Sequence, residues 1–241
     1  MMSFTVVIPA RKASTRLPNK PLLDLDGQSL VQRVYVQATK SKANRVVIAT
    51  DSKEILEHSQ KFGAEAILTN ADHNSGTDRV HEASLLLEIP DNEIIVNVQG
   101  DEPFIDPEDI NQTAFLLKEK NNFDISTLYS PIESDQIDNH NVVKIWMNNQ
   151  EVLLFSRDPH ELNETSNRYR HLGIYAYSLS TLSLFVSWEM SEGEKTQKLE
   201  QLRGLENGLK FGAKISVSKV HLGIDTPSDI DKALEIIKNG N

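Results

Sequence analysis

Short apolar runs rich in β-branched residues alternate with segments of helical periodicity through the first hundred residues. The apolar runs cover residues 4–8, 45–50, 64–68 and 93–98. The helical patterns cover residues 28–41, 53–62 and 77–87. A strand buried on both faces of a parallel sheet has such a continuous apolar run, and connections between parallel strands are right-handed. This half of the chain therefore predicts an α/β fold with a doubly wound, Rossmann-like, mostly parallel sheet.

The second half of the chain is less regular. Its strand-like segments cover residues 124–132, 141–148, 151–157, 170–178 and 214–220, with a hairpin turn at Asn148 and Asn149. Its helical patterns cover residues 180–188, 197–207 and 229–238, with Gly208 as a typical helix stop. Because we find no repeat, low-complexity segment or linker, we expect a single domain over residues 1–241. Residues 123–190 are expected to form a smaller mixed-sheet insertion in it.

The overall charge limits the partners that this chain can bind. Its 241 residues carry a formal net charge of -10, and the pI is near 5.2. Binding to nucleic acid or to an anionic membrane depends on a broad basic surface, so we expect neither partner. The absence of cysteine excludes disulfides and thiolate metal sites. No signal peptide is recognisable and no stretch approaches the ~20 apolar residues of a membrane span, so we expect a cytoplasmic protein.

A cluster of cations stands out in this acidic chain. The sequence VVIPARKASTRLPNKPLL covers residues 6–23, and its cations are Arg11, Lys12, Arg16 and Lys20. It follows the first predicted strand, and ligands of parallel α/β sheets bind beyond the carboxyl ends of the strands. With the Ser14 hydroxyl and free backbone N–H groups, these cations could surround a polyphosphate. A solvated loop is the alternative, but the prolines restrict the loop's shape. Neither a Walker loop nor a G-x-G-x-x-G motif is present.

Acidic side chains follow another predicted strand. Gln99, Asp101 and Glu102 come directly after the strand at 93–98, at the same expected sheet edge as the cations. Mg²⁺ is commonly held by one or two carboxylates together with substrate phosphates. Helix capping is the alternative role, but Asp106 can cap the next helix, which leaves Asp101 available. Asp225 precedes the last helix, where capping is its simplest role; as a partner of Asp101 it becomes a candidate second metal ligand.

Two further stretches place polar side chains beside helices. ADHNSGTDRV puts Ser75, Thr77 and Arg79 around a helix start, where capping accounts for part of the pattern. LEQLRGLENG is an amphipathic helix with a leucine stripe, and Glu200 and Gln201 lie off that stripe. The seven histidines lack zinc-ligand spacing, and no Gly-x-Ser-x-Gly elbow occurs.

On these motifs the chain resembles the 3-deoxy-manno-octulosonate (Kdo) cytidylyltransferases, the CMP-Kdo synthetase family. The resemblance covers nearly the whole length. It rests on IPARKASTRLPNKPL, ATD, DHNSGTDR, VNVQGDEP, LFSR, RHLGIYAY, KLEQLRGLENG and GIDTPSDI, in the family's order. It implies a Rossmann-like fold of the nucleotide-diphospho-sugar transferase type, usually a homodimer, in which residues 123–190 serve the sugar side and dimerisation. It also implies Mg²⁺ as cofactor, and a reaction of CTP with Kdo that releases pyrophosphate in lipopolysaccharide synthesis.

The resemblance implies a role for individual residues. The triphosphate loop corresponds to Arg11, Ser14, Arg16 and Lys20. The cytidine surroundings correspond to Thr50, Asp51, Ser75, Thr77 and Arg79. The sugar site corresponds to Gln99, Arg157, His171, Tyr175, Glu200 and Gln201. Asp101 and Asp225 correspond to the Mg²⁺ ligands, Asp101 also belongs to the nucleotide site, and we assign catalysis to these two with Arg11 and Lys20.

Some positions depart from the family pattern. Lys12 replaces a usual aromatic residue, Asn19 a usual glycine and Gln197 a usual glutamate. The stretch after Arg157 lacks the usual signature and is short and acidic over residues 158–164. Since the last change and Gln197 fall on the sugar side, the resemblance constrains the nucleotide more closely than the sugar.

Three alternatives follow. The acidic loop motivates the 8-amino analogue of Kdo, whose ammonium group would favour nearby carboxylates. A CMP-sialate-type or other sugar nucleotidyltransferase is a second possibility, against which the HLGIYAY and LEQLR segments argue. A nucleotide-binding regulatory protein without turnover is the third, and retention of both Asp101 and Asp225 argues against it.

Overall fold

The computed structural model describes residues 3–13, 16–119, 122–159 and 168–240. The strands are β1 (Phe4–Ala10), β2 (Arg45–Thr50), β3 (Glu65–Leu68), β4 (Ile94–Asn97), β5 (Ile125–Pro131), β6 (Lys144–Asn148), β7 (Glu151–Ser156), β8 (Tyr169–Ser178) and β9 (Phe211–Ile215). The α-helices are α1 (Leu30–Thr39), α2 (Lys53–Lys61), α3 (Gly76–Leu86), α4 (Pro107–Glu119), α5 (Leu179–Ser187), α6 (Glu192–Gln197), α7 (Gln201–Glu206) and α8 (Pro227–Lys238). Two 3-10 turns are η1 (Lys20–Leu22) and η2 (Ser134–Gln136).

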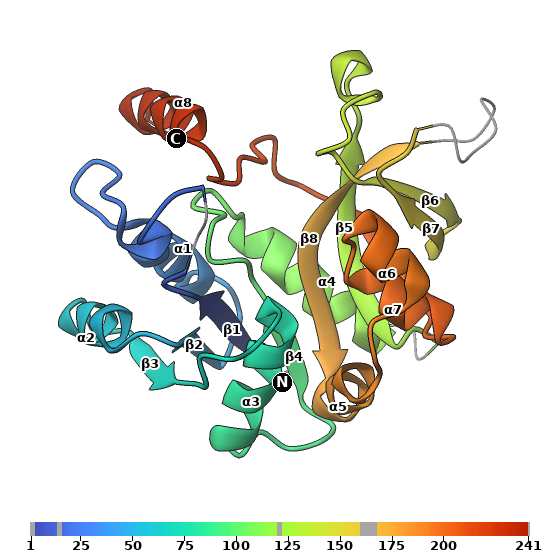
Figure 1. The fold of residues 1–241 in the computed structure, drawn as a ribbon, viewed down its shortest axis with the longest axis horizontal. Coiled ribbons are helices and arrows are strands. Elements are labelled where there is room, and N and C mark those ends of the chain that lie inside the picture. Colours follow the sequence, from blue (N-terminus) through green and yellow to red (C-terminus); the bar gives the residue numbers. More distant parts are fainter. Residues whose placement is uncertain (1–2, 14–15, 120–121, 160–167, 241) are drawn as a thin grey trace.

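All of these strands belong to one sheet with the order β3-β2-β1-β4-β8-β5-β9-β7-β6 (Figure 1). Strands β3, β2, β1 and β4 are parallel, and α1, α2 and α3 connect or flank them. This arrangement is the one predicted for the first hundred residues. The loops that follow β1, β2 and β4 consequently emerge at one edge of the sheet.

The remainder of the sheet is mixed, as expected for the second half of the chain, but it joins the parallel strands, so the sheet as a whole is not mostly parallel. Strand β8 runs antiparallel to both β4 and β5, while β5 and β9 are parallel. The β6–β7 hairpin returns to β8 and to β9, which closes strands β8, β5, β9, β7 and β6 into a ring. The expected mixed-sheet insertion is therefore part of the same sheet rather than a second sheet.

Two boundaries differ from the sequence-based expectation. The helix predicted over 197–207 begins only at Gln201, as α7, because Lys198 has a left-handed backbone with φ 53° and ψ 47° that ends the preceding helix, α6, which the sequence did not predict. The strand predicted within 214–220 begins earlier, at Phe211, and ends at Ile215. The expected hairpin turn and helix stop are confirmed, since Asn149 and Gly208 have φ of 56° and 88°.

The sheet separates two apolar cores. Successive residues of β1 point to opposite faces, so Val6 and Ile8 enter one core and Val7 enters the other. The first core includes residues of α1, α4 and α8, such as Leu30. The second includes residues of α3, α5 and α7, such as Leu202. Within the described ranges, no helix has the length and apolar character needed to cross a membrane.

Gly100 lets the chain after β4 approach the end of β1. A Cβ atom at this position would lie 2.6 Å from the backbone oxygen of Pro9, a distance that side-chain rotation cannot relieve. The contact sets the distance between the start of the basic loop and Asp101, the residue that follows Gly100.

We predict that Gly100→Ala lowers the free energy of unfolding by about 1–3 kcal/mol, because the backbone of one segment must move. Urea unfolding measures the change. Gly173→Ala is the control, since the nearest atom to its added Cβ is 3.9 Å away. Equal losses of unfolding free energy in the two variants would show that the close contact with Pro9 does not restrict the residue at position 100.

Candidate active site

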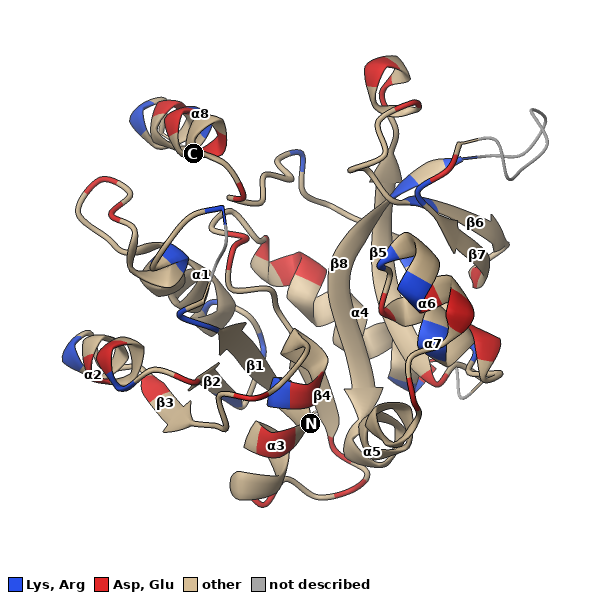
Figure 2. Ribbon diagram, in the orientation of Figure 1, with Lys and Arg blue, Asp and Glu red and all other residues tan. Residues whose placement is uncertain are grey.

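Three charged side chains from distant parts of the chain meet at the carboxyl edge of the parallel strands. Lys20, in η1, places its Nζ 2.7 Å from Oδ2 of Asp101 and 2.9 Å from Oδ1 of Asp225. Arg16 brings a second cation, with a nitrogen 3.3 Å from Oδ1 of Asp225. Figure 2 shows basic and acidic segments facing each other where the basic loop, the chain after β4 and the chain before α8 meet. The structure thus joins the basic loop and Asp101, which the sequence placed at one sheet edge, and brings Asp225 to them.

Asp225 does not cap α8, although capping was its simplest expected role. Thr226 is the N-cap of this helix and forms a capping box with Asp229. The carboxylate of Asp229 accepts the backbone N–H groups of Thr226 and Asp225 at 2.9 and 3.1 Å. The Asp225 carboxylate therefore remains available to the cations of the basic loop. Asp106 does cap α4, as predicted, by accepting the N–H of Glu108 at 2.8 Å.

The electrostatic balance keeps Lys20 charged. Burial by itself lowers the pKa of Lys20, but the ion pairs with Asp101 and Asp225 outweigh it and raise the pKa above its ordinary value. Burial and the neighbouring Asp101 also raise the pKa of Glu102 to about 7. Glu102 is thus partly protonated near neutral pH.

The donor set fits a divalent cation that is shared with a ligand. Oxygens of Asp101 and Asp225 both contact the single Nζ atom of Lys20, so the two carboxylates already converge on one positive charge. Two carboxylates completed by substrate phosphates are a usual Mg²⁺ environment. In the described part of the chain, no group of three or more His, Asp or Glu side chains could hold a metal alone.

A cavity of about 570 Å³ opens beside this cluster. The predicted site residues that line it are Arg11, Arg16, Lys20, Ser75, Arg79, Gln99, Asp101, Arg157, Glu200 and Asp225. Lys12 points elsewhere, since its Nζ lies 2.7 Å from Glu54 on α2. Ser14 lies outside the described residues. The cavity is therefore bordered by cations on the loop side and opposite them by side chains that follow β4, lie at the start of α3 or precede α7.

Asp51 joins the basic loop to the segment before α3. One carboxylate oxygen accepts the backbone N–H of Lys12 at 2.9 Å, and the other lies 3.1 Å from a guanidinium nitrogen of Arg79. The Arg79 and Asp51 side chains are only 3% and 11% exposed. Thr50 is buried, and its carbonyl accepts the N–H of Thr69 at 2.8 Å. Thr50 and Asp51 thus shape the site rather than line the cavity.

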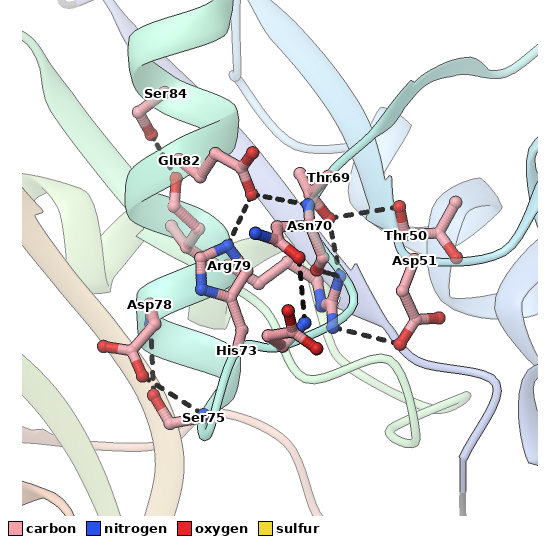
Figure 3. Close-up of polar contacts among 12 residues, drawn as sticks. Thr50, Asp51, Thr69, Asn70, His73, Ser75, Asp78, Arg79, Glu82 and Ser84 are labelled. Carbon is pink, nitrogen blue, oxygen red and sulfur yellow. Dashed lines mark hydrogen bonds and ion pairs between the residues drawn. The ribbon is translucent and has the colours of Figure 1, made fainter.

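The guanidinium of Arg79 is fixed from several sides (Figure 3). It reaches from α3 toward Asp51 and also donates to the hydroxyl of Thr69 at 2.5 Å and to the carbonyl of Asn70 at 3.1 Å. Glu82, one turn further along α3, accepts the N–H of Asn70 at 2.8 Å and contacts His73. These contacts hold the 69–75 segment, which carries the DHNS sequence, against α3.

Ser75 and Thr77 lie at the start of α3 opposite Glu200. Ser75 is the N-cap and forms a capping box with Asp78, which confirms the expected capping role. Burial of the Glu200 carboxyl raises its pKa, and the Ser75 and Thr77 hydroxyls oppose this shift. One Glu200 oxygen, Oε1, is buried without a hydrogen-bond partner in the described ranges. An acceptor of this kind is suited to a donor from a ligand.

The remaining residues of the predicted sugar site gather around a second cavity of about 290 Å³. His171, Tyr175 and Gln201 line it, together with Arg157. Burial lowers the pKa of His171 to about 3 and raises the pKa of Tyr175, so both are neutral at pH 7. Gln99 belongs instead to the first cavity, which adjoins the second through shared residues.

Arg157 is held by backbone carbonyl groups. Its guanidinium donates to the carbonyls of Gln197, His140 and Asn141 at 2.9–3.3 Å. The side-chain oxygen of Gln197, one of the positions that depart from the family, accepts the backbone N–H of Arg157 at 2.9 Å. Asn19, another departure, has the left-handed φ of 55°, which asparagine tolerates better than most residues.

Sequence reasoning missed Lys198 as a residue of the site. It lines both cavities, and only its position in KLEQLR beside Glu200 could have signalled this. The acidic loop falls mostly outside the described residues, which include Asp158 but not Glu161 or Glu164. Asp158 lines a third, neighbouring cavity of about 620 Å³.

Comparison with known proteins agrees with this geometry. The profile of the family described as cytidylyltransferase matches residues 5–214. The chain belongs to this family. It is 44% identical over 245 residues to the 3-deoxy-manno-octulosonate cytidylyltransferase of Polynucleobacter asymbioticus, a match that covers 98% of this chain and 96% of that protein. It is 41% identical to the enzyme of the same name from Haemophilus influenzae, covering 98% and 99%.

A solved structure gives the same result for the fold. The structure of CMP:2-keto-3-deoxy-manno-octonic acid synthetase complexed with CTP superposes with a TM-score of 0.92 and 33% sequence identity over the full length of both chains. The resemblance drawn from the eight sequence motifs is therefore confirmed, as is the α/β nucleotidyltransferase fold. The parallel and mixed parts of the sheet belong to one cytidylyltransferase fold.

We predict that Asp51→Ala destabilises the protein by about 3 kcal/mol or more, because it leaves the buried Arg79 guanidinium without its carboxylate. It should also weaken CTP binding, since both flanking segments lose their common anchor. Urea unfolding and calorimetric CTP titration measure the two effects.

The control for this variant is Glu65→Ala, which removes the exposed partner of Arg45 between β2 and β3. We expect its loss of stability to stay below about 1 kcal/mol. If Asp51→Ala lowered the free energy of unfolding no more than Glu65→Ala does and bound CTP with wild-type affinity, Asp51 would not be the residue that fixes the two segments.

Proposed function

We propose that this chain transfers the CMP group of CTP to 3-deoxy-manno-octulosonate, giving CMP-Kdo and pyrophosphate for lipopolysaccharide synthesis. The observation that carries the proposal is the convergence of Asp101, Asp225 and Lys20 beside a cavity that the basic loop borders. Such a site suits a triphosphate and a cation that accompanies it. Membership of the cytidylyltransferase family and the names of the full-length relatives support the choice of CTP and Kdo.

The placement of the two substrates follows from the charges. The triphosphate would lie against Arg11, Arg16 and Lys20, and the cytidine would extend toward the segment fixed by Arg79. The sugar acid would occupy the second cavity, beside Tyr175 and Gln201. The reacting groups would then meet where the two cavities adjoin, beside Arg157 and Lys198.

In this arrangement the anomeric hydroxyl of the sugar attacks the α-phosphorus of CTP. A new bond forms between the sugar oxygen and this phosphorus, the hydroxyl proton passes to solvent, the bond from the α-phosphorus to the oxygen of the β-phosphate breaks, and pyrophosphate leaves. Asp101 and Asp225 would hold Mg²⁺, which when bound neutralises charge on the phosphates. Arg11, Arg16 and Lys20 bind the leaving pyrophosphate and stabilise its charge. Positioning and electrostatic stabilisation supply most of the rate in such transfers, and the reaction needs no covalent intermediate.

We also propose the oligomeric state, the metal cofactor and the location of the protein. We retain a homodimer, an Mg²⁺ cofactor and a cytoplasmic location, because the family resemblance, the acid pair and the CTP substrate favour them. Asp158 is the one acid of residues 158, 161 and 164 that the structure describes, and it lines the cavity next to the sugar cavity. This position keeps the 8-amino analogue of Kdo as a second candidate substrate.

The test is pyrophosphate release from CTP with Mg²⁺, with Kdo and its 8-amino analogue supplied in parallel and without sugar as a blank. We expect release with Kdo and none in the blank. Release with the amino sugar alone would replace Kdo by that substrate. No pyrophosphate release with either sugar would contradict the proposed function.

The same assay examines the acid pair. Asp101→Asn and Asp225→Asn should each lower kcat/KM by roughly a hundredfold or more, because each removes a charge from the cation site. Asp231→Asn, an exposed acid on α8, is the matched control and should retain activity. Full activity in both site variants would show that the reaction does not depend on the two carboxylates.

A further inference from the structure

Three adjoining cavities share two cationic residues. Their volumes are about 570, 290 and 620 Å³, and each is lined by both Arg157 and Lys198. The first is the proposed CTP cavity and the second the proposed sugar cavity. The two side chains therefore lie at the junction where two anionic substrates must approach each other.

The two cations differ in how far their donors are already used. The guanidinium of Arg157 donates to three backbone carbonyl groups, so much of its hydrogen-bonding capacity serves the protein. Lys198 is exposed, and its ammonium has no hydrogen bond or ion pair to any residue in the described ranges. Lys198 is thus the cation at the junction that remains available to a ligand.

The backbone around Lys198 is held firmly. Its N–H donates to the carbonyl of Glu194 at 2.7 Å, and Glu194 forms a buried ion pair with Arg203 at 2.7 Å. The next residue, Leu199, belongs to the second core. Lys198 itself has the left-handed φ of 53°, which costs a non-glycine residue about 1–2 kcal/mol. Unusual backbone conformations of this kind occur frequently at ligand sites.

We propose that Lys198 binds the carboxylate of the sugar acid, an inference that rests on the proposed function. The triphosphate already has Arg11, Arg16 and Lys20, whereas two of the three cavities that Lys198 lines contain none of these cations. The carboxylate of the acceptor and the phosphates of CTP repel each other. An ammonium between them reduces this repulsion and directs the carboxylate toward the sugar side.

The test compares Lys198→Gln with Lys195→Gln in steady-state pyrophosphate release, varying Kdo and CTP separately. Lys195 lies three residues earlier on α6, is about half exposed and pairs with Glu192 at 2.9 Å outside the three cavities. Loss of one charge-assisted hydrogen bond should raise the KM for Kdo about tenfold or more in Lys198→Gln. The KM for CTP should change little, and Lys195→Gln should match the wild type.

Two further variants separate charge from backbone conformation. Lys198→Gly favours the left-handed backbone but lacks the ammonium, so it should show the same rise in KM for Kdo as Lys198→Gln. Lys198→Arg keeps the positive charge and should recover most of the affinity. A wild-type KM for Kdo in Lys198→Gly would mean that Kdo affinity depends on the backbone conformation at position 198 and not on the ammonium charge, and would overturn the proposal.

The remaining outcomes distinguish this proposal from the function on which it rests. An active wild type with an unchanged KM for Kdo in Lys198→Gln would overturn the role of Lys198 and leave the function intact. A rise in the KM for CTP instead of Kdo would also overturn it, because Lys198 would then bind phosphate. A wild type without activity on CTP and Kdo would overturn both.

Discussion

The ion pairs of Lys20 with Asp101 and Asp225 are the interaction on which the arrangement of the site depends. They join the basic loop, the chain after β4 and the chain before α8, which are about 80 and 120 residues apart along the sequence. Two carboxylates that face one point repel each other unless a positive charge lies between them. Lys20 supplies that charge, and its own burial is compensated by the same contacts.

The site is completed by a second set of contacts at the other end of the basic loop. Asp51 holds the backbone of Lys12 and the guanidinium of Arg79, so the loop is fixed near both of its ends. Opposite the loop, the left-handed backbone of Lys198 separates α6 from α7 and places a cation where three cavities meet. The substrates of the proposed reaction are both anions, and this distribution of cations on two sides accommodates both.

The parallel strands and the position of the basic loop could be predicted from the sequence. Continuous apolar runs identify buried strands, and the carboxyl ends of parallel strands lie at the same edge of the sheet. That reasoning placed the basic loop beside Asp101. It could not give the closed ring of β5 to β9, because the order of strands in a mixed sheet depends on pairings between distant segments. It also missed α6 and began the following helix at 197 instead of 201, since the left-handed conformation of a lysine has no signal in the apolar pattern. The sequence left capping and metal binding open for Asp225, and the structure assigns the cap of α8 to Thr226.

The claim that Asp101 and Asp225 converge on one cation can be tested without any substrate. Lys20→Met leaves the two carboxylates facing each other without a cation, so in EDTA its Tm should be lower than that of the wild type. Adding millimolar MgCl2 should raise the Tm of Lys20→Met by more than it raises the Tm of the wild type. Lys12→Met, which removes an exposed ion pair with Glu54, is the control and should show no such response. A Tm of Lys20→Met that responds to Mg²⁺ no more than the control would contradict the central claim.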